Sequence, residues 1–262
     1  MTQLTRRRLF TAGGAAAGGL ILAGCDSLAT NAPLTGVIRS AEGATRRWQR
    51  LVTDRGALAR EFTAADISPV FKANGSKEVD DAAYLAHLDQ DFANWRLVVD
   101  GLVNTPLALS LAQLKSMPQR SQITRHDCVE GWSAIGGWTG PQLGTLLKAA
   151  NLKTNARYLI FHCADDYGGE LSKGGPRSMS RYYESIDLID GFHPQTILAH
   201  MMNGAPLDVA HGAPIRLRVE RQLGYKHAKY VMRVEAVASL AGIGGGKGGY
   251  WEDRGYEWYA GI

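Results

Sequence analysis

Residues 124–133 read TRHDCVEGWS and contain Cys128, from which the chemistry of this 262-residue chain can be inferred. Of the two other cysteines, only Cys163 lies away from the N-terminus. Cysteine counting alone favours a Cys128–Cys163 disulfide, because an exported protein tolerates such bonds. A different interpretation makes His126 and Asp127 a set that activates the thiol for hydrolase or transferase chemistry. Neighbours along a strand rarely point at each other, which disfavours that interpretation.

The apolar pattern on both sides of this stretch predicts short strands and short helices. Strands are expected over Trp95–Gly101, Tyr158–Phe161 and Pro214–Glu220. Helices are expected between Ser110 as the cap and Pro118, after Pro141 with Leu143, Leu146, Leu147 and Ala150 on one face, and over Pro194–Met202 before Asn203-Gly204. This mixture predicts one α+β domain with β-hairpins and several short helices.

The strand predicted over Pro214–Glu220 alternates between apolar and charged residues. Its apolar positions should face the core, whereas Arg216 and Arg218 should face the other way. From the pattern alone, outward arginines on such a strand are solvated side chains.

Two blocks of sequence together resemble a known family. The first is CVEGWS at 128–133 with WTG at 138–140, and the second is HGAPIRL at 211–217, GYK at 224–226 and then Lys229. In residues and in spacing they resemble the sulfite-oxidase superfamily, in its periplasmic methionine-sulfoxide reductase branch. The resemblance extends from about Asn74 to Val234 and implies a single mixed α+β molybdopterin-binding domain.

The resemblance implies that Cys128 is the catalytic residue and binds the metal of a molybdenum–molybdopterin cofactor. A thiolate is a soft, strongly donating ligand, which suits this role. The residues that the resemblance places on the cofactor are Asn74, Cys163, His211, Arg216, His227, Ala228 and Lys229. His211 stands where the branch usually has asparagine, and Cys163 where it has threonine, so only the backbone of Cys163 carries over with ease. Glu130 and Trp132 fit the pocket wall and the core equally well.

The N-terminus carries two targeting motifs. RRLF at 7–10 resembles the twin-arginine signal, which exports folded proteins, and LAGC at 22–25 resembles a lipobox that leads to lipidation of Cys25. We expect a signal peptide over 1–24, a lipidated tether without regular structure over 25–45, and the oxidoreductase domain over 46–262. The protein would then be anchored at the periplasmic face of the inner membrane. Without Arg6, Arg7 and Arg8 the formal charge of +4 falls to +1, so no nucleic-acid partner is expected.

The predicted function is oxygen-atom transfer, with reduction of an S- or N-oxide favoured and sulfite oxidation as the alternative. The substrate is a small-molecule oxide or oxyanion, and Arg125 and Arg177 are candidates to bind an anion. No Cys-x-x-Cys-His haem motif is present. Electrons should therefore pass to or from a membrane cytochrome or a quinol-linked partner, with the chain itself a monomer. The alternative of another class is a ligand-binding or scaffolding lipoprotein with a Cys128–Cys163 disulfide.

The C-terminal segment, GGGKGGYWEDRGYEWY at 244–259, combines a glycine run with five aromatic residues. Disordered tails lack such aromatics, so we expect this segment to fold back over the domain and to border the substrate pocket or a partner site. The glycine run is not a phosphate loop, because no Gly-Lys-Ser or Gly-Lys-Thr follows it.

Overall fold

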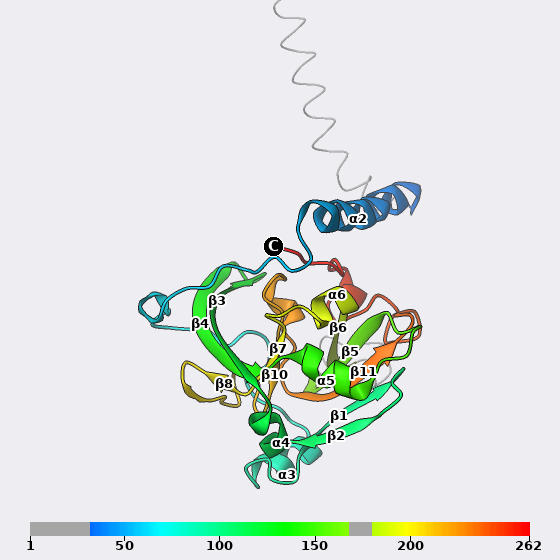
Figure 1. The fold of residues 1–262 in the computed structure, drawn as a ribbon. Helices are drawn as coiled ribbons and strands as arrows, with labels where there is room; N and C mark the ends of the chain where they lie inside the picture. The colour runs from blue at the N-terminus through cyan, green and yellow to red at the C-terminus, as the bar shows by residue number, and fades with distance from the viewer. Residues whose placement is uncertain (1–31, 168–179) are drawn as a thin grey trace, which may run out of the picture. The chain divides into compact units, whose positions relative to one another are not determined.

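The structure is a computed structural model that describes residues 32–167 and 180–262 (Figure 1). The expected signal peptide, Cys25 and Arg177 lie outside the described residues. Two compact units are separated between Val52 and Thr53, and the first contains helix α2, Ala32–Val52. Residues 32–45 of the expected tether thus belong to this helix. No described helix is long and apolar enough to cross a membrane.

The second unit contains a five-stranded sheet with the strand order β2-β1-β11-β5-β6. The strands are β1 Arg96–Gly101, β2 Leu107–Ser110, β5 Tyr158–Asp166, β6 Arg181–Asp187 and β11 Val231–Val237. Strands β1 and β11 are parallel, and the other neighbours are antiparallel. The main apolar core includes residues of this sheet and of helix α5, Leu143–Ala150, whose four predicted apolar residues are all buried.

A second sheet is dominated by one long hairpin, seen as the curved green ribbons in Figure 1. It has the order β3-β4-β8-β9, with β3 Gln119–Cys128, β4 Trp132–Pro141, β8 Met201–Met202 and β9 Ala205–Pro206. Cys128 pairs with Trp132 as the last pair of the hairpin, and Gly131 at φ 85° makes the turn between them. A separate pair joins β7 Ile197–Ala199 to β10 Arg216–Arg218.

Short helices complete the unit: α3 Ala82–Leu88, α4 Leu111–Ser116, α6 Leu188–Gly191, and the 3-10 helices η1 Ala64–Asp66, η3 Gly224–Lys226 and η4 Glu252–Arg254. Helix α4 begins as predicted, because the Ser110 side chain accepts a hydrogen bond from the Gln113 amide. The mixed α+β prediction and the three predicted strands are confirmed.

The helix predicted over Pro194–Met202 is wrong. The segment forms β7 and β8, and Asn203 and Gly204, both with positive φ, make the turn into β9. Asn-Gly is the preferred loop of a two-residue hairpin, whereas we interpreted it as a helix end. A short apolar run does not distinguish a buried strand from a buried helix by period alone.

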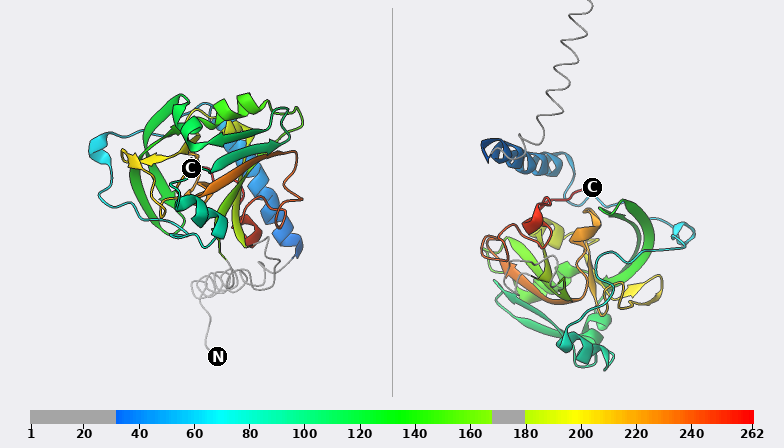
Figure 2. Two further views of the ribbon diagram at one scale, coloured as in Figure 1. Left: turned by 90° about the horizontal axis from the view of Figure 1, so that it is seen from below. Right: turned by 180° about the vertical axis from the view of Figure 1, so that it is seen from behind.

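The C-terminal segment does fold back onto the domain, as predicted (Figure 2). Tyr250 is fully buried, and its amide donates to the carbonyl of Tyr183 at 2.9 Å. Two residues beyond the segment, Gly261 forms an antiparallel bridge with Gln222. The segment is therefore part of the packed core, next to η3.

Candidate functional site

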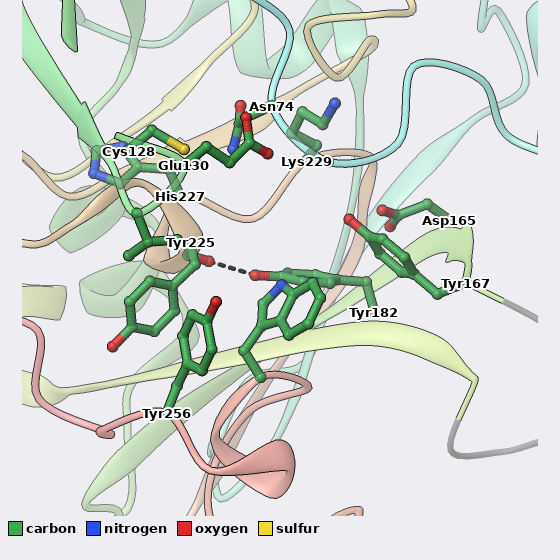
Figure 3. Close-up of a pocket in the computed structure, with 13 residues that line it drawn as sticks. Asn74, Cys128, Glu130, Asp165, Tyr167, Tyr182, Tyr225, His227, Lys229 and Tyr256 are labelled. Carbon is green, nitrogen blue, oxygen red and sulfur yellow. Dashed lines mark hydrogen bonds between the residues drawn. The ribbon is translucent and has the colours of Figure 1, made fainter. Parts of the chain in front are cut away.

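The last residue of β3, Cys128, lies at a pocket built from segments that are far apart in the sequence (Figure 3). Its lining residues are Asn74, Gly75, Cys128, Val129, Glu130, Asp165, Tyr167, Tyr182, Tyr225, His227, Lys229, Trp251 and Tyr256. Cys128 is half-buried, and this burial raises the pKa of its thiol. A coordinated metal deprotonates a thiol outright, so the raised pKa does not oppose metal binding.

Both Cys128 and Cys163 are free thiols. Cys163 is buried in the apolar core on β5, and its Sγ lies 3.8 Å from the carbonyl oxygen of Phe161. The disulfide alternative is therefore wrong, and with it the scaffold interpretation that depended on the disulfide.

Arg216 is a buried cation without a carboxylate partner among the described residues. Its Nη1 donates to the carbonyl of His211 at 3.1 Å, and its Nη2 to the carbonyl of His227 at 3.4 Å. Its Nε has no partner there, and burial with the nearby Arg218 lowers the pKa of Arg216 to about 9. A buried cation is costly unless an anion is close. The arginine is thus arranged to receive an anionic group.

Lys229 repeats this arrangement at the pocket wall. Its Nζ donates to the backbone carbonyls of Ser76 and of Ala210, the latter at 2.8 Å. Burial, assisted by Arg216, lowers the pKa of Lys229 to about 7. The hydrogen bonds of these two neighbouring cations within the described protein go to backbone carbonyls, so both would gain much from a phosphate, whose oxygens accept charge-assisted hydrogen bonds.

Arg218 is buried, not solvated as the strand pattern alone suggested. Its Nε and Nη2 donate to the carboxylate of Glu220 at 2.9 and 2.6 Å, and its Nη1 lies 2.9 Å from Nδ1 of His126. His126 therefore accepts through Nδ1, and burial followed by the charge of Arg218 holds its pKa well below the usual value. This arginine belongs to a structural network.

The hydrolase alternative finds no support in this geometry. His126 is bound to Arg218, and Asp127 accepts from Arg125 at 2.9 Å and from Ser133 at 2.5 Å. Neither side chain contacts Cys128 in these hydrogen bonds. Arg125, which was a candidate to bind an anionic substrate, is paired with Asp127 and does not line the Cys128 pocket.

Several buried polar atoms around the pocket have no partner in the described protein. They are Oδ1 of Asn74, Oδ1 of Asp165 and Nδ1 of His227. His227 donates through Nε2 to the carbonyl of Gln222 at 3.0 Å, so its Nδ1 is an acceptor. Buried polar groups nearly always have partners, and a molybdopterin presents many amide, amine and phosphate atoms. The residues present therefore fit this cofactor.

The structure brings Asn74, Cys128, His227 and Lys229 together at one pocket, with Arg216 bound to the backbone beside it. His211, Cys163 and Ala228 do not line the pocket. The ring of His211 is occupied, because Nδ1 lies 2.7 Å from Asp208 and Nε2 lies 3.2 Å from the carbonyl of Phe71. Contacts of these last three residues with the cofactor stay predictions.

Sequence reasoning missed most of the acidic and aromatic lining: Asp165, Tyr167, Tyr182 and Tyr225. Asp165 lies near the end of the buried strand β5, beyond the apolar run Tyr158–Phe161 from which the strand was predicted, and this position is its only local signal. The sequence left open whether Glu130 and Trp132 belong to the pocket wall or to the core. Glu130 lines the pocket. Trp132 does not line it, but its Nε1 donates a hydrogen bond to the Glu130 carboxylate at 2.9 Å.

Comparison with known proteins places this site in a family. The sequence model of the oxidoreductase molybdopterin-binding domain matches residues 84–240, more than half of the chain. A putative protein-methionine-sulfoxide reductase subunit YedZ1 of Azospira oryzae is 41% identical over 171 residues, 65% of this chain and 57% of its own length. The protein-methionine-sulfoxide reductase catalytic subunit MsrP of Xanthomonas campestris is 34% identical over 148 residues, 56% of this chain and 46% of its own.

This chain thus spans about half the length of the curated relatives that it matches. Among solved structures, the sulfane dehydrogenase SoxCD of Paracoccus pantotrophus is similar over 56% of this chain and 39% of the SoxCD chain. The TM-score is 0.48 and the sequence identity is 22%. From the family match and the pocket around Cys128, the chain belongs to the oxidoreductase molybdopterin-binding domain family of the sulfite oxidase superfamily.

Proposed function

We propose that the protein is a molybdenum-dependent oxidoreductase that reduces an organic S- or N-oxide at Cys128. One observation carries this proposal: a free cysteine opens on a pocket that Lys229 lines, with the buried Arg216 beside it, and neither cation has a carboxylate partner within ion-pair distance among the described residues. The two relatives whose names specify methionine-sulfoxide reductases support the choice of substrate.

The residues that would hold the cofactor divide by chemistry. Cys128 would bind the molybdenum through its thiolate. Arg216 and Lys229 would bind the terminal phosphate, and Asn74 and the acceptor Nδ1 of His227 would bind polar atoms of the pterin. When bound, the cofactor supplies oxygen-atom transfer between metal and substrate, with a two-electron change of the metal.

The overall reaction takes one oxide, two protons and two electrons to the reduced sulfide or amine and one water. The chain's own contribution is to position the oxide and to hold protons near it. Asp165 is suited to the second task, because burial raises its pKa to about 7. The electrons would come from a membrane cytochrome or a quinol-linked protein.

Anchoring would keep the enzyme beside such a partner. The RRLF motif at 7–10 and the LAGC motif at 22–25 support twin-arginine export and lipidation of Cys25, and so a place at the periplasmic face of the inner membrane. Cys25→Ser should shift the protein from the membrane fraction to the soluble periplasm. Continued membrane attachment of the variant would contradict this anchor.

The function is tested on purified, molybdenum-loaded protein with two assays. A reduced viologen dye is offered with methionine sulfoxide or trimethylamine N-oxide, and ferricyanide is offered with sulfite. We expect dye oxidation with an organic oxide and none with sulfite and ferricyanide. Sulfite-dependent reduction of ferricyanide without oxide reduction would replace the proposal by sulfite oxidation.

A further inference from the structure

The C-terminal segment, residues 241–262, lies beyond the family-matched residues 84–240 yet contributes to the pocket of Cys128. It supplies Trp251 and Tyr256, and the ring of Tyr256 meets that of Tyr225 in η3. We call Tyr225, Trp251 and Tyr256 the aromatic wall. Figure 3 shows Tyr225 and Tyr256 across the pocket from Cys128 and Glu130. Two of the three wall residues, Trp251 and Tyr256, thus lie outside the family-matched residues, whereas Tyr225 lies within them.

The rings of the wall are packed against one another. Trp251 and Tyr256 are stacked with ring centroids 5.4 Å apart and planes 28° apart, and Tyr225 meets Tyr256 edge-on at 5.2 Å. The Tyr225 hydroxyl also donates to the carbonyl of Glu257 at 2.5 Å. The ring faces are therefore fixed before any ligand arrives, which lowers the entropic cost of binding.

A buried ionic cluster fastens the segment to the domain. Lys226 Nζ donates to Glu184 of β6 and, at 2.6 Å, to Glu252 of the segment, and all three side chains are at most 1% exposed. Trp258 adds a hydrogen bond from Nε1 to the hydroxyl of Ser185 at 2.8 Å. Because Lys226 follows Tyr225 and Glu252 follows Trp251, this cluster holds two members of the wall at once.

The charges of the pocket are unequally placed. The three wall residues carry no charged side chain. The acidic residues that line the pocket are Glu130 and Asp165. The one lysine of the lining, Lys229, is bound to backbone carbonyls and is needed for the cofactor phosphate. None of the described lining residues offers a free cation at the wall to an inorganic oxyanion. Aromatic faces instead attract apolar groups and methyl groups polarised by an adjacent sulfur or nitrogen.

We propose that the aromatic wall is the substrate-binding surface and selects organic oxides that carry methyl or alkyl groups on the oxidised atom over inorganic oxyanions. This inference rests on the proposed function. In it, the methyl group packs against Trp251 and Tyr256 while the oxygen points to the metal side of the pocket, at Cys128.

Dimethyl sulfone and sulfate provide a matched pair of probes, since both are tetrahedral at sulfur and differ only in two methyl groups for two charged oxygens. Binding is measured on the molybdenum-loaded protein by titration of the sulfone methyl proton signal, with sulfate as a competitor. The variants are Trp251→Leu, which keeps an apolar side chain without a ring, and Phe192→Leu as the control, which makes the same kind of change at an exposed aromatic residue outside the pocket lining. Molybdenum content is measured for each.

We expect sulfone to bind the parent protein and sulfate not to displace it. Trp251→Leu should weaken sulfone binding by about tenfold, the loss of one ring contact, at unchanged molybdenum content. Phe192→Leu should leave the sulfone affinity unchanged, because this side chain does not line the pocket. Equal sulfone affinity in Trp251→Leu and the parent, displacement by sulfate, or loss of molybdenum from Trp251→Leu would each overturn the inference. The proposed function fails separately, if the parent binds sulfone but reduces no organic oxide.

Discussion

Replacing Lys226 by methionine should destabilise the protein strongly, and more at neutral than at acidic pH. In the native chain the ammonium is fully buried between Glu184 and Glu252. Burial opposes its charge, but the two carboxylates outweigh that effect and raise the pKa of Lys226. Burial, with the neighbouring Glu252, also raises the pKa of Glu184 well above its usual value. In this cluster one ammonium thus faces two carboxyl groups, and Lys226→Met removes that ammonium.

The size of the effect follows from the protons that the buried acids must take up. A glutamic acid that ionises near pH 4.3 in the unfolded chain but stays protonated in the fold costs about 4 kcal/mol at pH 7 and about 1 kcal/mol at pH 5. The first value agrees with the roughly 3–5 kcal/mol measured when one partner of a buried ion pair is removed. Adding Glu184→Gln and Glu252→Gln to Lys226→Met should restore most of the loss at pH 7, because no buried acid remains.

Urea unfolding of the parent, the single variant and the triple variant at pH 5 and pH 7 measures these differences. The C-terminal segment should also become sensitive to proteolysis in the single variant, since Glu252 is its ionic attachment. A loss below about 1 kcal/mol at pH 7, or an equal loss at both pH values, would refute this reasoning, given that buried pairs cost far more to break.

The other predictions concern the pocket. Arg216→Met should keep or raise the stability of the cofactor-free protein and lower its molybdenum retention by about tenfold or more, measured by metal analysis, because the guanidinium has no protein anion. The stability contribution of Asp165 is present below its unfolded pKa of 3.8 and lost as pH rises to about 7, since burial raises its pKa. Asp165→Asn should therefore match the cofactor-free parent at pH 4 and exceed it at pH 8 in melting temperature; a constant difference would argue against this. Cys128 and Cys163 should both react with a thiol reagent after unfolding of cofactor-free protein without reductant; no reaction would indicate a disulfide.

Local pattern sufficed for the parts of the fold that are stabilised locally. Ser110 and Pro118 mark the ends of α4, and the apolar spacing in Leu143–Ala150 gives the buried face of α5. The segment Pro194–Met202 failed because its pairing partners, β4 and β10, are distant in the sequence. All three residues of β7 are buried, which removed the alternation that identifies a half-exposed strand.

The candidate site was only partly predictable for the same reason. The resemblance to a known family identified Cys128, Arg216 and Lys229. Such a resemblance can be recognised from motifs in one sequence, without the structure. The burial of Arg218 depends on His126 from another sheet, and no pattern on β10 encodes that partner. Asp165 of β5 and Tyr225 of η3 are 60 positions apart in the sequence and meet at the pocket only in the folded protein. The aromatic composition of the C-terminal segment did indicate that it packs, which places Trp251 at the pocket.

Molybdenum analysis of the exported, folded protein tests the central claim most directly. Parent protein, Cys128→Ser and the control Cys163→Ser are purified in parallel, and metal per chain is compared with the circular dichroism of each. The account predicts about one molybdenum per chain in the parent and in Cys163→Ser, and almost none in a folded Cys128→Ser, because one thiolate ligates one metal. Molybdenum retained in full by Cys128→Ser, or absent from all three folded proteins, would contradict the assignment of Cys128 as the ligand.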